Sequence, residues 1–297
     1  MTSQSGILLI DKPIGISSAQ ALNIVKRRLK LAKIGHSGTL DPFASGLLVA
    51  LSASCTKLAF APEAGLKEYE GEITFGTATD TDDLTGKIIK ESSHLPTIEE
   101  LKKMIPEYIG FIKQTPPIYS ALKIGGKRSY LLARAGDDKS RTLPAPRQVY
   151  VRDFSVRQID EKRFAFKVVC GKGFYLRALA RDLGDSLRSA AHLSALRRTR
   201  VGEFTVEQGK SPEEIAIADL LPFDKLFPAA RLIILEDKII KALQNGNLLP
   251  LKRLEPTLNN LQFGELIVYQ DQNENPQGIL KFAAKSWELI YALQNKS

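Results

Sequence analysis

The sequence predicts an α+β fold whose central sheet is mixed but largely antiparallel, with helices on its flanks. Three observations carry this prediction. The stretch from Lys67 to Thr77 alternates apolar and polar residues, which is the period of a half-buried strand. Two further strands, Gln148 to Ile159 and Arg163 to Cys170, are separated only by a short polar turn, as in an antiparallel hairpin. Helical patterns are interspersed among these strands, which is typical of α+β proteins.

The N-terminal part combines two buried strands with a capped helix. Gly6 to Ile10 and Leu47 to Leu51 are short apolar runs of strand length. Between them, Ser17 and Ser18 are suitable N-caps for a helix from Ala19 to Lys30. The cations at the end of this helix suit the helix dipole. Ser52 to Phe60 is expected to form a second, short helix.

The middle of the chain continues this mixture. Lys87 to Glu91 is expected to be a strand that pairs with the preceding one, and a capping box at Thr97 begins a helix. A later helix ends near Leu187 and places Arg177 and Arg181 on one face, because they are four residues apart. After it we expect a basic segment up to Arg200, a strand from 201 to 208 and a helix that begins at 211.

Pro228 marks the expected domain boundary, with a first domain over residues 1–228 and a second over 231–297. The second domain is predicted to contain a helix from Glu236 to Gln244. Strands follow at 264–270, 277–284 and 287–293, so this part is a small β-rich unit.

The composition is that of a globular protein, at 43% hydrophobic and 25% charged residues in 297. No apolar run reaches the length of about 20 residues that a membrane span needs, and we expect no membrane association. Two cysteines form no disulfide framework, which favours a reducing cytoplasm. The three histidines lack partners at ligand spacing, so no metal is expected. The acidic loop at 79–86 could supply oxygen ligands to calcium but lacks the distal glutamate of a calcium loop.

Positive charge is concentrated in the middle of the chain. Residues 121–200 hold 19 Lys and Arg against 7 Asp and Glu, a balance of +12, whereas the remainder sums to −3. Such an uneven distribution favours a polyanionic partner, with RNA or DNA before a membrane surface. A solvated basic surface without a partner would have the same composition.

The stretch from Gly35 to Gly46 is the densest in residues suited to chemistry. It holds three glycines, His36 and Asp41, and Asp41 directly precedes a proline. An Asp followed by Pro is also a common helix start, with Asp as the N-cap and Pro at the first helical position. From these residues alone, a helix cap and a catalytic carboxylate both remain open.

Five stretches in order favour the catalytic carboxylate, although the same turn could serve both purposes. They are Leu9-Ile10-Asp11-Lys12-Pro13, Gly35-His36-Ser37-Gly38-Thr39-Leu40-Asp41-Pro42-Phe43-Ala44-Ser45-Gly46-Leu47-Leu48, Lys67-Glu68-Tyr69, Pro116-Pro117-Ile118-Tyr119-Ser120-Ala121-Leu122-Lys123, and Gly173-Phe174-Tyr175-Leu176-Arg177 with the later Ala191-His192-Leu193 and Leu196-Arg197-Arg198. Together they resemble the TruB family of tRNA pseudouridine synthases. Ser37, Phe43 and Ser45 are conservative departures from the family pattern.

The resemblance implies the pseudouridine synthase fold and the isomerisation of a uridine in the T-loop of tRNA, at position 55. This chemistry needs no redox change and no group donor, so no cofactor is expected. The partner would be the T-arm stem-loop of tRNA, and the enzyme is expected to act as a monomer.

The resemblance also assigns roles to individual residues. Asp41 is implied as the catalytic carboxylate, Arg177 as the partner that orients it, and Tyr69 as a stacking platform that also assists proton removal. The implied substrate contacts are made by His36, Tyr69, Asp83, Tyr175 and Leu196.

Two further regions are implied to bind RNA. Lys123, Lys127 and Arg128 fall in an insertion at about 111–147, where the family carries an RNA-clamping segment. The C-terminal unit resembles a PUA-type RNA-binding barrel, although a generic β module is an open alternative there. A non-catalytic RNA-binding or RNA-folding protein on the same scaffold is one alternative, but the intact Asp41, Tyr69 and Arg177 argue against it. An RNA-guided synthase in a ribonucleoprotein shares the core motifs. The chain's own basic insertion and short C-terminal unit favour the stand-alone enzyme.

Overall fold

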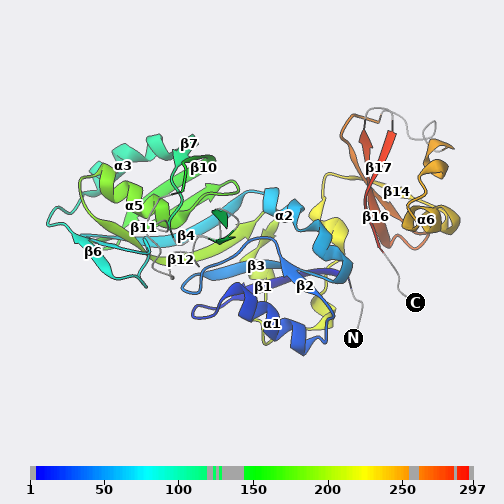
Figure 1. Cartoon of the computed structure of the whole chain (residues 1–297), viewed down its shortest axis with the longest axis horizontal. Coiled ribbons are helices and arrows are strands. Elements are labelled where there is room, and N and C mark those ends of the chain that lie inside the picture. Colours follow the sequence, from blue (N-terminus) through cyan, green and yellow to red (C-terminus); the bar gives the residue numbers. More distant parts are fainter. Residues whose placement is uncertain are drawn as a thin grey trace.

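The computed structural model describes residues 5–118, 123–124, 127–128, 144–253, 261–283 and 286–293. Side chains are described in these ranges except at 123–124, 127–128 and 252–253. Figure 1 shows a large body built on one long, twisted sheet and a smaller C-terminal body beside it. The expected α+β class, with a mixed and mostly antiparallel sheet, is therefore confirmed.

The large sheet follows the spatial order β1-β3-β12-β4-β11-β10-β7, with β2 paired to β3 and β13 paired to β12. These strands are β1 (Gly6–Lys12), β2 (Ile34–His36), β3 (Ser45–Ser52), β4 (Lys67–Phe75), β7 (Gly110–Gln114), β10 (Arg147–Gln158), β11 (Arg163–Cys170), β12 (Ala191–Val201) and β13 (Phe204–Thr205). Among the pairings that the structure describes in this sheet, only the short contact between β3 and β12 is parallel.

Short helices and two small ribbons complete the large body. The α-helices are α1 (Ser18–Arg28), α2 (Phe60–Ala64), α3 (Ile98–Met104) and α5 (Leu176–Ser186). The 3₁₀ helices are η1 (Ala53–Leu58), η2 (Ile105–Tyr108), η4 (Val206–Gln208), η5 (Ile217–Asp219) and η6 (Phe223–Leu226). The ribbons pair β5 (Thr77–Thr79) with β6 (Ile88–Glu91), and β8 (Lys123–Ile124) with β9 (Lys127–Arg128).

Helix α1 forms where the sequence predicts it, and its start is fixed by local hydrogen bonds. Ser17 and Gln20 complete a capping box, which satisfies two backbone amides that have no partner within the helix. Ala21, Leu22 and Val25 face the first core cluster, which they form with residues of β1 and β3. Burial of this apolar face holds the helix against the N-terminal edge of the sheet.

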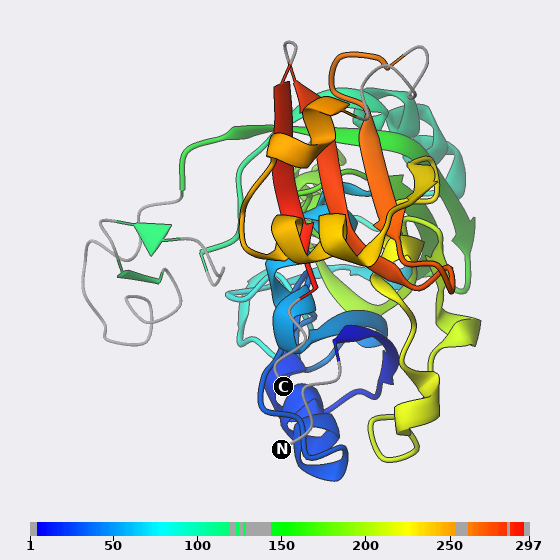
Figure 2. The same ribbon diagram turned by 90° about the vertical axis from the view of Figure 1, so that its right-hand side faces the viewer.

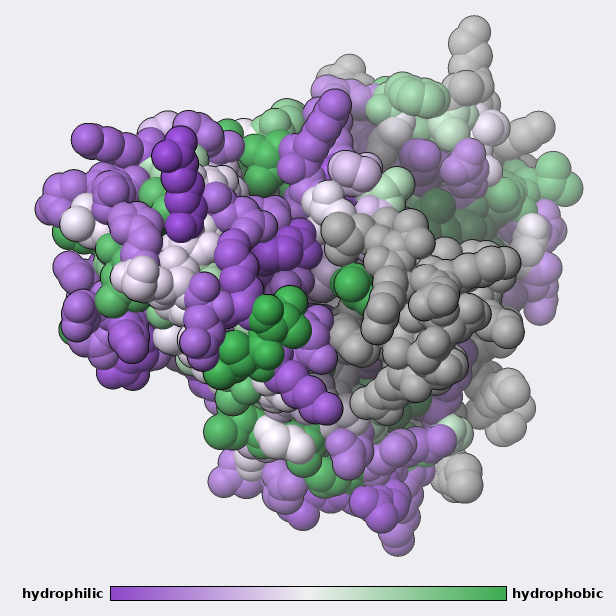
Figure 3. All heavy atoms as spheres, turned by 60° about the vertical axis from the view of Figure 1, so that its left-hand side comes forward, coloured by the Kyte–Doolittle hydropathy of each residue, from purple (hydrophilic) through white to green (hydrophobic). Residues whose placement is uncertain are grey.

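The alternation along β4 divides the middle of the sheet into two faces. Tyr69, Ile73 and Phe75 are buried in the main core, on the face that α5 covers, together with Leu179 and Leu183 of that helix. The intervening glutamates of β4 point to the opposite face, since successive side chains of a strand alternate. The residues that Figure 3 colours by hydropathy are mostly hydrophilic on this face, with hydrophobic groups among them.

The sheet is nearly divided between β3 and β12. These strands pair only through Arg197 with Ser45 and Arg198 with Gly46. The backbone at Asp82–Leu84 bonds to Leu193 of β12. The loop of residues 37–44 contacts the same strand where the Gly38 carbonyl accepts from Arg198. The break therefore brings two polar loops next to the central strands.

Gly46 is required at this break. Its φ is +105°, and an added Cβ would lie 2.3 Å from the carbonyl oxygen of Arg198 and 2.7 Å from its nitrogen. Replacement by alanine is expected to lower the free energy of unfolding by several kcal/mol, because backbone strain and a backbone clash add. Thermal or urea unfolding of Gly46→Ala measures this loss. Gly15→Ala is the matched control, because Gly15 has φ +88° but open space around it, so it should lose only about 1–2 kcal/mol. Equal losses in the two variants would contradict the clash.

The C-terminal body is a four-stranded sheet in the order β14-β15-β16-β17 with one helix against it. Its elements are β14 (Arg231–Ile234), α6 (Asp237–Gln244), β15 (Leu266–Gln270), β16 (Pro276–Ala283) and β17 (Ser286–Ala292), with η7 (Leu249–Arg253) after the helix. Figure 2 shows this body facing the viewer, in front of the large sheet. Tyr291 joins the two bodies, since its hydroxyl lies 2.7 Å from Ser54 Oγ and its ring packs edge-on against Phe223.

Three local predictions were wrong. The segment that begins at Ser211 forms turns and η5 rather than a helix, because it runs along β1 through bridges at Lys210 and Leu221. The expected strand at 201–208 is interrupted, with β13 and then η4 after the end of β12. β6 pairs with β5 rather than with β4. In the described part of the chain, no helix has the length and apolarity to cross a membrane.

Candidate active site

Asp41 lies in a rigid turn rather than at the start of a helix. The backbone over Asp41 to Ala44 forms a turn closed by the Ala44 amide, which donates to the Asp41 carbonyl at 3.1 Å. Ser18 holds the preceding residue, because its hydroxyl and the Leu40 backbone exchange hydrogen bonds of 2.8 and 3.0 Å. The Gly15 amide donates to the Pro42 carbonyl at 2.7 Å. The loop is thus fixed on both sides of Asp41, whose side chain is still 37% exposed.

Arg177, in the first turn of α5, lies against the Asp41 carboxylate. Its Nε is 3.0 Å from Asp41 Oδ2, and its side chain is only 10% exposed. Burial raises the pKa of Asp41 above its ordinary value, and the Arg177 charge opposes this rise. The sequence resemblance implies this pairing, and the structure brings the two side chains together.

Two acceptors fix the other end of the Arg177 guanidinium. Nη1 donates to the Thr81 carbonyl at 3.1 Å and lies 3.6 Å from Asp83 Oδ2. Asp83, implied as a nucleotide contact, is itself 4% exposed, and its other carboxylate oxygen accepts from Thr81 and Thr85. In this structure the buried Asp83 carboxylate is an ion-pair partner of Arg177.

Tyr69 and Leu196 lie on neighbouring strands, on the sheet face that α5 covers. Tyr69 of β4 is paired with Arg198 of β12, and Leu196 stands two residues earlier on β12. Both side chains are less than a tenth exposed. Burial raises the pKa of Tyr69, and the charge of Arg198 opposes the rise.

Tyr175 and His36 are held by backbone contacts. Tyr175 directly precedes α5, and its backbone amide and carbonyl both bond to the Gln114 side chain, at 2.8 and 3.1 Å. His36 is in β2, where its Nδ1 accepts from the Gly38 amide at 3.2 Å. Burial lowers the pKa of His36, so the neutral ring is favoured.

The predicted clamp residues Lys123, Lys127 and Arg128 belong to the two-residue strands β8 and β9. Their side chains lie outside the described residues. Their role in RNA binding therefore stays a prediction.

Two buried cations beside the site were not singled out from the sequence. Arg198, 2% exposed, donates from Nε to the Leu47 carbonyl at 2.7 Å and from Nη2 to the Gly38 carbonyl at 3.1 Å. It thereby holds both ends of the loop that carries Asp41. The fully buried Lys12 donates to the carbonyls of Pro13 and Ile16, at 2.8 and 2.7 Å. Both residues lie inside motifs that carry the resemblance, and this position was the sequence signal that could have identified them.

Comparison with known protein families shows which family the chain belongs to. Residues 26–176 match the model of the TruB family pseudouridylate synthase N-terminal domain. The chain belongs to the TruB family. Residues 177–221 match the tRNA pseudouridylate synthase B C-terminal domain, so the two matches together contain the side chains from His36 to Leu196 described above.

Curated relatives agree over most of the chain. The tRNA pseudouridine synthase B of Acholeplasma laidlawii is 36% identical over 281 residues, covering 94% of this chain and 99% of that protein. The protein of the same name from Bordetella pertussis is 42% identical over 213 residues, covering 71% and 86%. Among solved structures, a Cbf5-Nop10-Gar1 complex matches with a TM-score of 0.66 at 21% identity, over 98% of this chain and 84% of that one. At that identity the likeness shows the fold alone.

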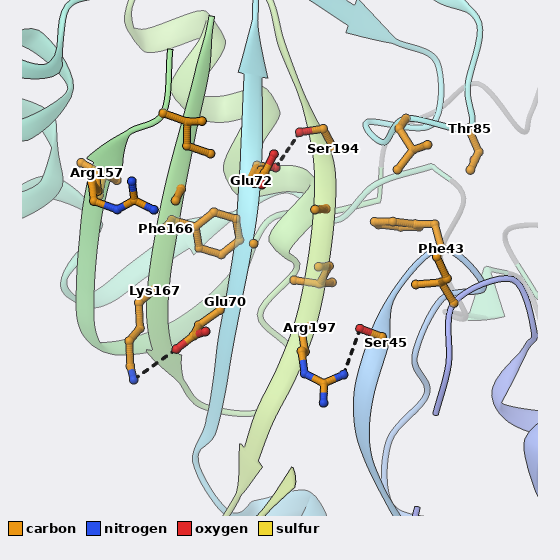
Figure 4. A pocket seen from close by; sticks show the side chains of 18 of the residues that line it. Phe43, Ser45, Glu70, Glu72, Thr85, Arg157, Phe166, Lys167, Ser194 and Arg197 are labelled. Atoms are coloured by element: carbon orange, nitrogen blue, oxygen red, sulfur yellow. Dashed lines mark hydrogen bonds and ion pairs between the residues drawn. The ribbon is translucent and has the colours of Figure 1, made fainter. Parts of the chain in front are cut away.

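In this TruB-family chain an open trough of about 1010 Å³ adjoins the Asp41 loop. Figure 4 shows Phe43 and Ser45 at one side of it and the strands β12, β4, β11 and β10 across its floor. Within it Lys167 Nζ lies 3.5 Å from Glu70 Oε1, and Arg197 Nη1 lies 3.4 Å from Ser45 Oγ. Leu196 lines the trough together with Pro42 and Phe43 of the Asp41 loop, whereas Asp41, Tyr69 and Arg177 do not line it.

The described residues hold no group of three or more His, Cys, Asp or Glu side chains arranged for a metal ion. What the arrangement offers is one partly exposed carboxylate, fixed by a guanidinium, next to a buried phenol and an aliphatic side chain. Such a group can act as a nucleophile or as a base toward a planar substrate that enters beside Tyr69.

Lys12 makes stability depend on pH. Burial lowers its pKa from 10.5 to about 8, and the Asp41 charge opposes this shift. Between these pH values the unfolded chain binds more protons than the folded one at this residue, so its contribution favours the folded state increasingly as pH rises. The unfolding free energy of the wild type minus that of Lys12→Met is therefore expected to increase from pH 8 to pH 10.5. Urea unfolding at several pH values measures this difference. A difference that does not change with pH would contradict the lowered pKa of Lys12.

Proposed function

We propose that this chain isomerises the uridine at position 55, in the T-loop of tRNA, to pseudouridine, with Asp41 as the catalytic carboxylate. The observation that carries the proposal is the ion pair between Asp41 and Arg177, formed next to Tyr69 in a member of the TruB family. The relatives named tRNA pseudouridine synthase B support tRNA as the substrate.

The reaction exchanges one bond between base and sugar for another. The bond from N1 of uracil to C1′ breaks, the base turns, and C5 bonds to C1′. The C5 proton is lost and N1 gains a proton, so atoms and electrons balance without a cofactor. Asp41 acts as a nucleophile that holds the separated fragment, as carboxylates do in retaining glycosidases. Arg177 orients Asp41 and, by its charge, favours the ionised form that attacks.

The target uridine lies in a folded loop and must leave its stack before it reaches Asp41, at a cost of a few kcal/mol. Tyr69 stacks on the flipped base and takes part in removing the C5 proton. Leu196 and Tyr175 enclose the base, and His36 supports the backbone of the splayed nucleotide. Stacking and apolar contact thus offset the loss of the loop's own stacking.

Basic residues outside the site hold the rest of the tRNA. Lys123, Lys127 and Arg128 in the insertion at 111–147 contact phosphates, so affinity falls as salt concentration rises. Residues 1–228 form the catalytic domain and 231–297 a PUA-like RNA-binding domain. The enzyme acts as a monomer on one tRNA, through its T-arm.

An unmodified tRNA transcript tests the proposed function. After incubation with the purified chain, nucleoside analysis should show one pseudouridine per tRNA, and position mapping should place it at 55. A transcript with cytidine at position 55 is the matched control and should gain none. Binding of the transcript without any conversion would instead favour a non-catalytic RNA-binding protein, and conversion only with an added guide RNA would favour a guided enzyme.

A further inference from the structure

Helix α5 carries a second arginine, Arg181, one turn beyond Arg177. Each of the two arginines contacts one of the adjacent aspartates Asp82 and Asp83. Arg177 Nη1 lies 3.6 Å from Asp83 Oδ2. Arg181 Nη1 lies 3.0 Å from Asp82 Oδ2. Because residues four apart in a helix share one face, the two ion pairs lie side by side between α5 and the loop at 79–86.

Arg181 also contacts a third part of the structure, the chain directly after β7. Its Nη2 donates to the carbonyl of Thr115 at 2.6 Å, where the chain leaves β7, and to Asp182 at 2.9 Å. The side chain is 19% exposed, and that of Asp82 is 15% exposed. The Arg181 guanidinium therefore donates to acceptors within the protein, and little of its surface is open to solvent.

The loop that Arg181 holds is strained at its centre. Asp82 has φ +61°, a left-handed conformation that costs about 1–2 kcal/mol for a residue with a side chain. The Leu193 amide bonds its carbonyl at 3.0 Å. Burial raises the pKa of Asp82 to about 6, and the charge of Arg181 opposes the rise. Without Arg181, a mostly buried carboxylate would remain in a strained turn, and water would be its better partner.

We propose that Arg181 is a positioning residue for the reaction at Asp41. It fixes the loop at 79–86 against α5, and this loop presents the Thr81 carbonyl and the Asp83 carboxylate to Nη1 of Arg177. Those two acceptors set the rotation of the guanidinium whose Nε faces Asp41. The role of Arg181 in turnover rests on the proposed function. A displacement of about 1 Å in a catalytic group can cost on the order of 100-fold in rate.

A direct contact between Arg181 and a tRNA phosphate is the competing role for a cation on this helix. The two roles differ in kinetics. Loss of a phosphate contact raises KM and reduces the salt dependence of binding. Loss of a positioning contact lowers kcat and leaves KM nearly unchanged.

The experiment compares three substitutions with a matched control. Arg181→Met keeps the length and removes the charge, Arg181→Lys keeps the charge but loses the fork that reaches two acceptors, and Asp82→Asn removes the partner charge. Lys90→Met is the control, because it breaks an exposed ion pair with Asp185 on the same helix. The readouts are kcat and KM on the tRNA transcript, and amide hydrogen exchange over residues 38–44 and 79–86.

We expect Arg181→Met to lower kcat roughly 10- to 100-fold with KM within about twofold of wild type. Arg181→Lys should recover only part of the loss. The double variant with Asp82→Asn should be no slower than Arg181→Met alone, because both changes remove one shared contact. Lys90→Met should match the wild type. An unchanged kcat, or a rise in KM with kcat intact, would overturn the positioning role.

Hydrogen exchange keeps this test independent of the proposed function. Arg181→Met should speed exchange both in the loop at 79–86 and, through Arg177, in the Asp41 loop at 38–44. Faster exchange confined to 79–86 would reduce Arg181 to a local structural role and overturn the inference. If the wild type made no pseudouridine, the proposed function would fail, and the exchange result alone would decide whether Arg181 positions the Asp41 loop.

Discussion

Asp41→Asn is expected to abolish pseudouridine formation while the protein stays folded. Asparagine keeps the size of the side chain and can still accept from Arg177 Nε, but it is neither a nucleophile nor a base. Removal of a reacting group of this kind costs about 1,000-fold or more in kcat. The fall is expected in single-turnover conversion of the tRNA transcript, so that product release does not mask it.

Stability and binding are the controls for this variant. The Asp41 side chain is 37% exposed and lies in a turn held by Ser18 and Gly15, so the melting temperature should change little. Affinity for tRNA should stay within a few-fold of wild type, because phosphate contacts elsewhere supply most of it. Turnover within tenfold of wild type in Asp41→Asn would remove Asp41 from the chemistry.

Arg177→Ala is expected to have the second largest effect, on both rate and stability. The guanidinium is the contact that fixes Asp41, so kcat should fall at least about 100-fold. The change also leaves the buried Asp83 carboxylate without its cation, at a cost of about 3 kcal/mol or more in unfolding free energy. Activity must therefore be measured well below the midpoint of thermal unfolding.

Arg177→Lys separates charge from geometry. Lysine keeps one positive charge but cannot face Asp41 and the Thr81 carbonyl at once, because it lacks the planar fork. It should recover most of the stability and little of the rate. A rise in KM that matches the fall in kcat/KM, with kcat preserved, would show instead that Arg177 is a contact to tRNA phosphate.

The elements with clear periodicity could be predicted from the sequence. The alternation along Lys67–Phe75 predicts a strand with one buried face, and the structure buries Tyr69, Ile73 and Phe75 there. The serine cap of α1 also predicts the start of that helix. These elements follow from local residue patterns, which a sequence carries directly.

Elements that depend on distant partners could not be predicted in this way. β2 is a three-residue strand that exists because β3 pairs with it. The segment after Ser211 has the start signals of a helix, but Ile215 is fully buried against the first core cluster and the chain follows β1 instead. Tertiary contacts override propensity in such short segments.

The same distinction holds for the candidate site. Motif order brings Asp41 and Arg177 to attention, and the structure brings them within 3.0 Å. The burial of Lys12 and Arg198 depends on the meeting of three strands and a loop, which no local pattern records. Asp83 illustrates the limit, since only the structure shows that its carboxylate faces Arg177.

The hydrogen at C5 of the target base offers the most direct test of a carboxylate-driven isomerisation. A T-arm stem-loop with tritium at C5 of its uridines should release one tritium to water for each pseudouridine formed by the wild type. Asp41→Asn should release none above background in the same assay. Release by Asp41→Asn at the wild-type rate, or none by the wild type, would contradict the account of Asp41 as the residue that acts on the flipped uridine.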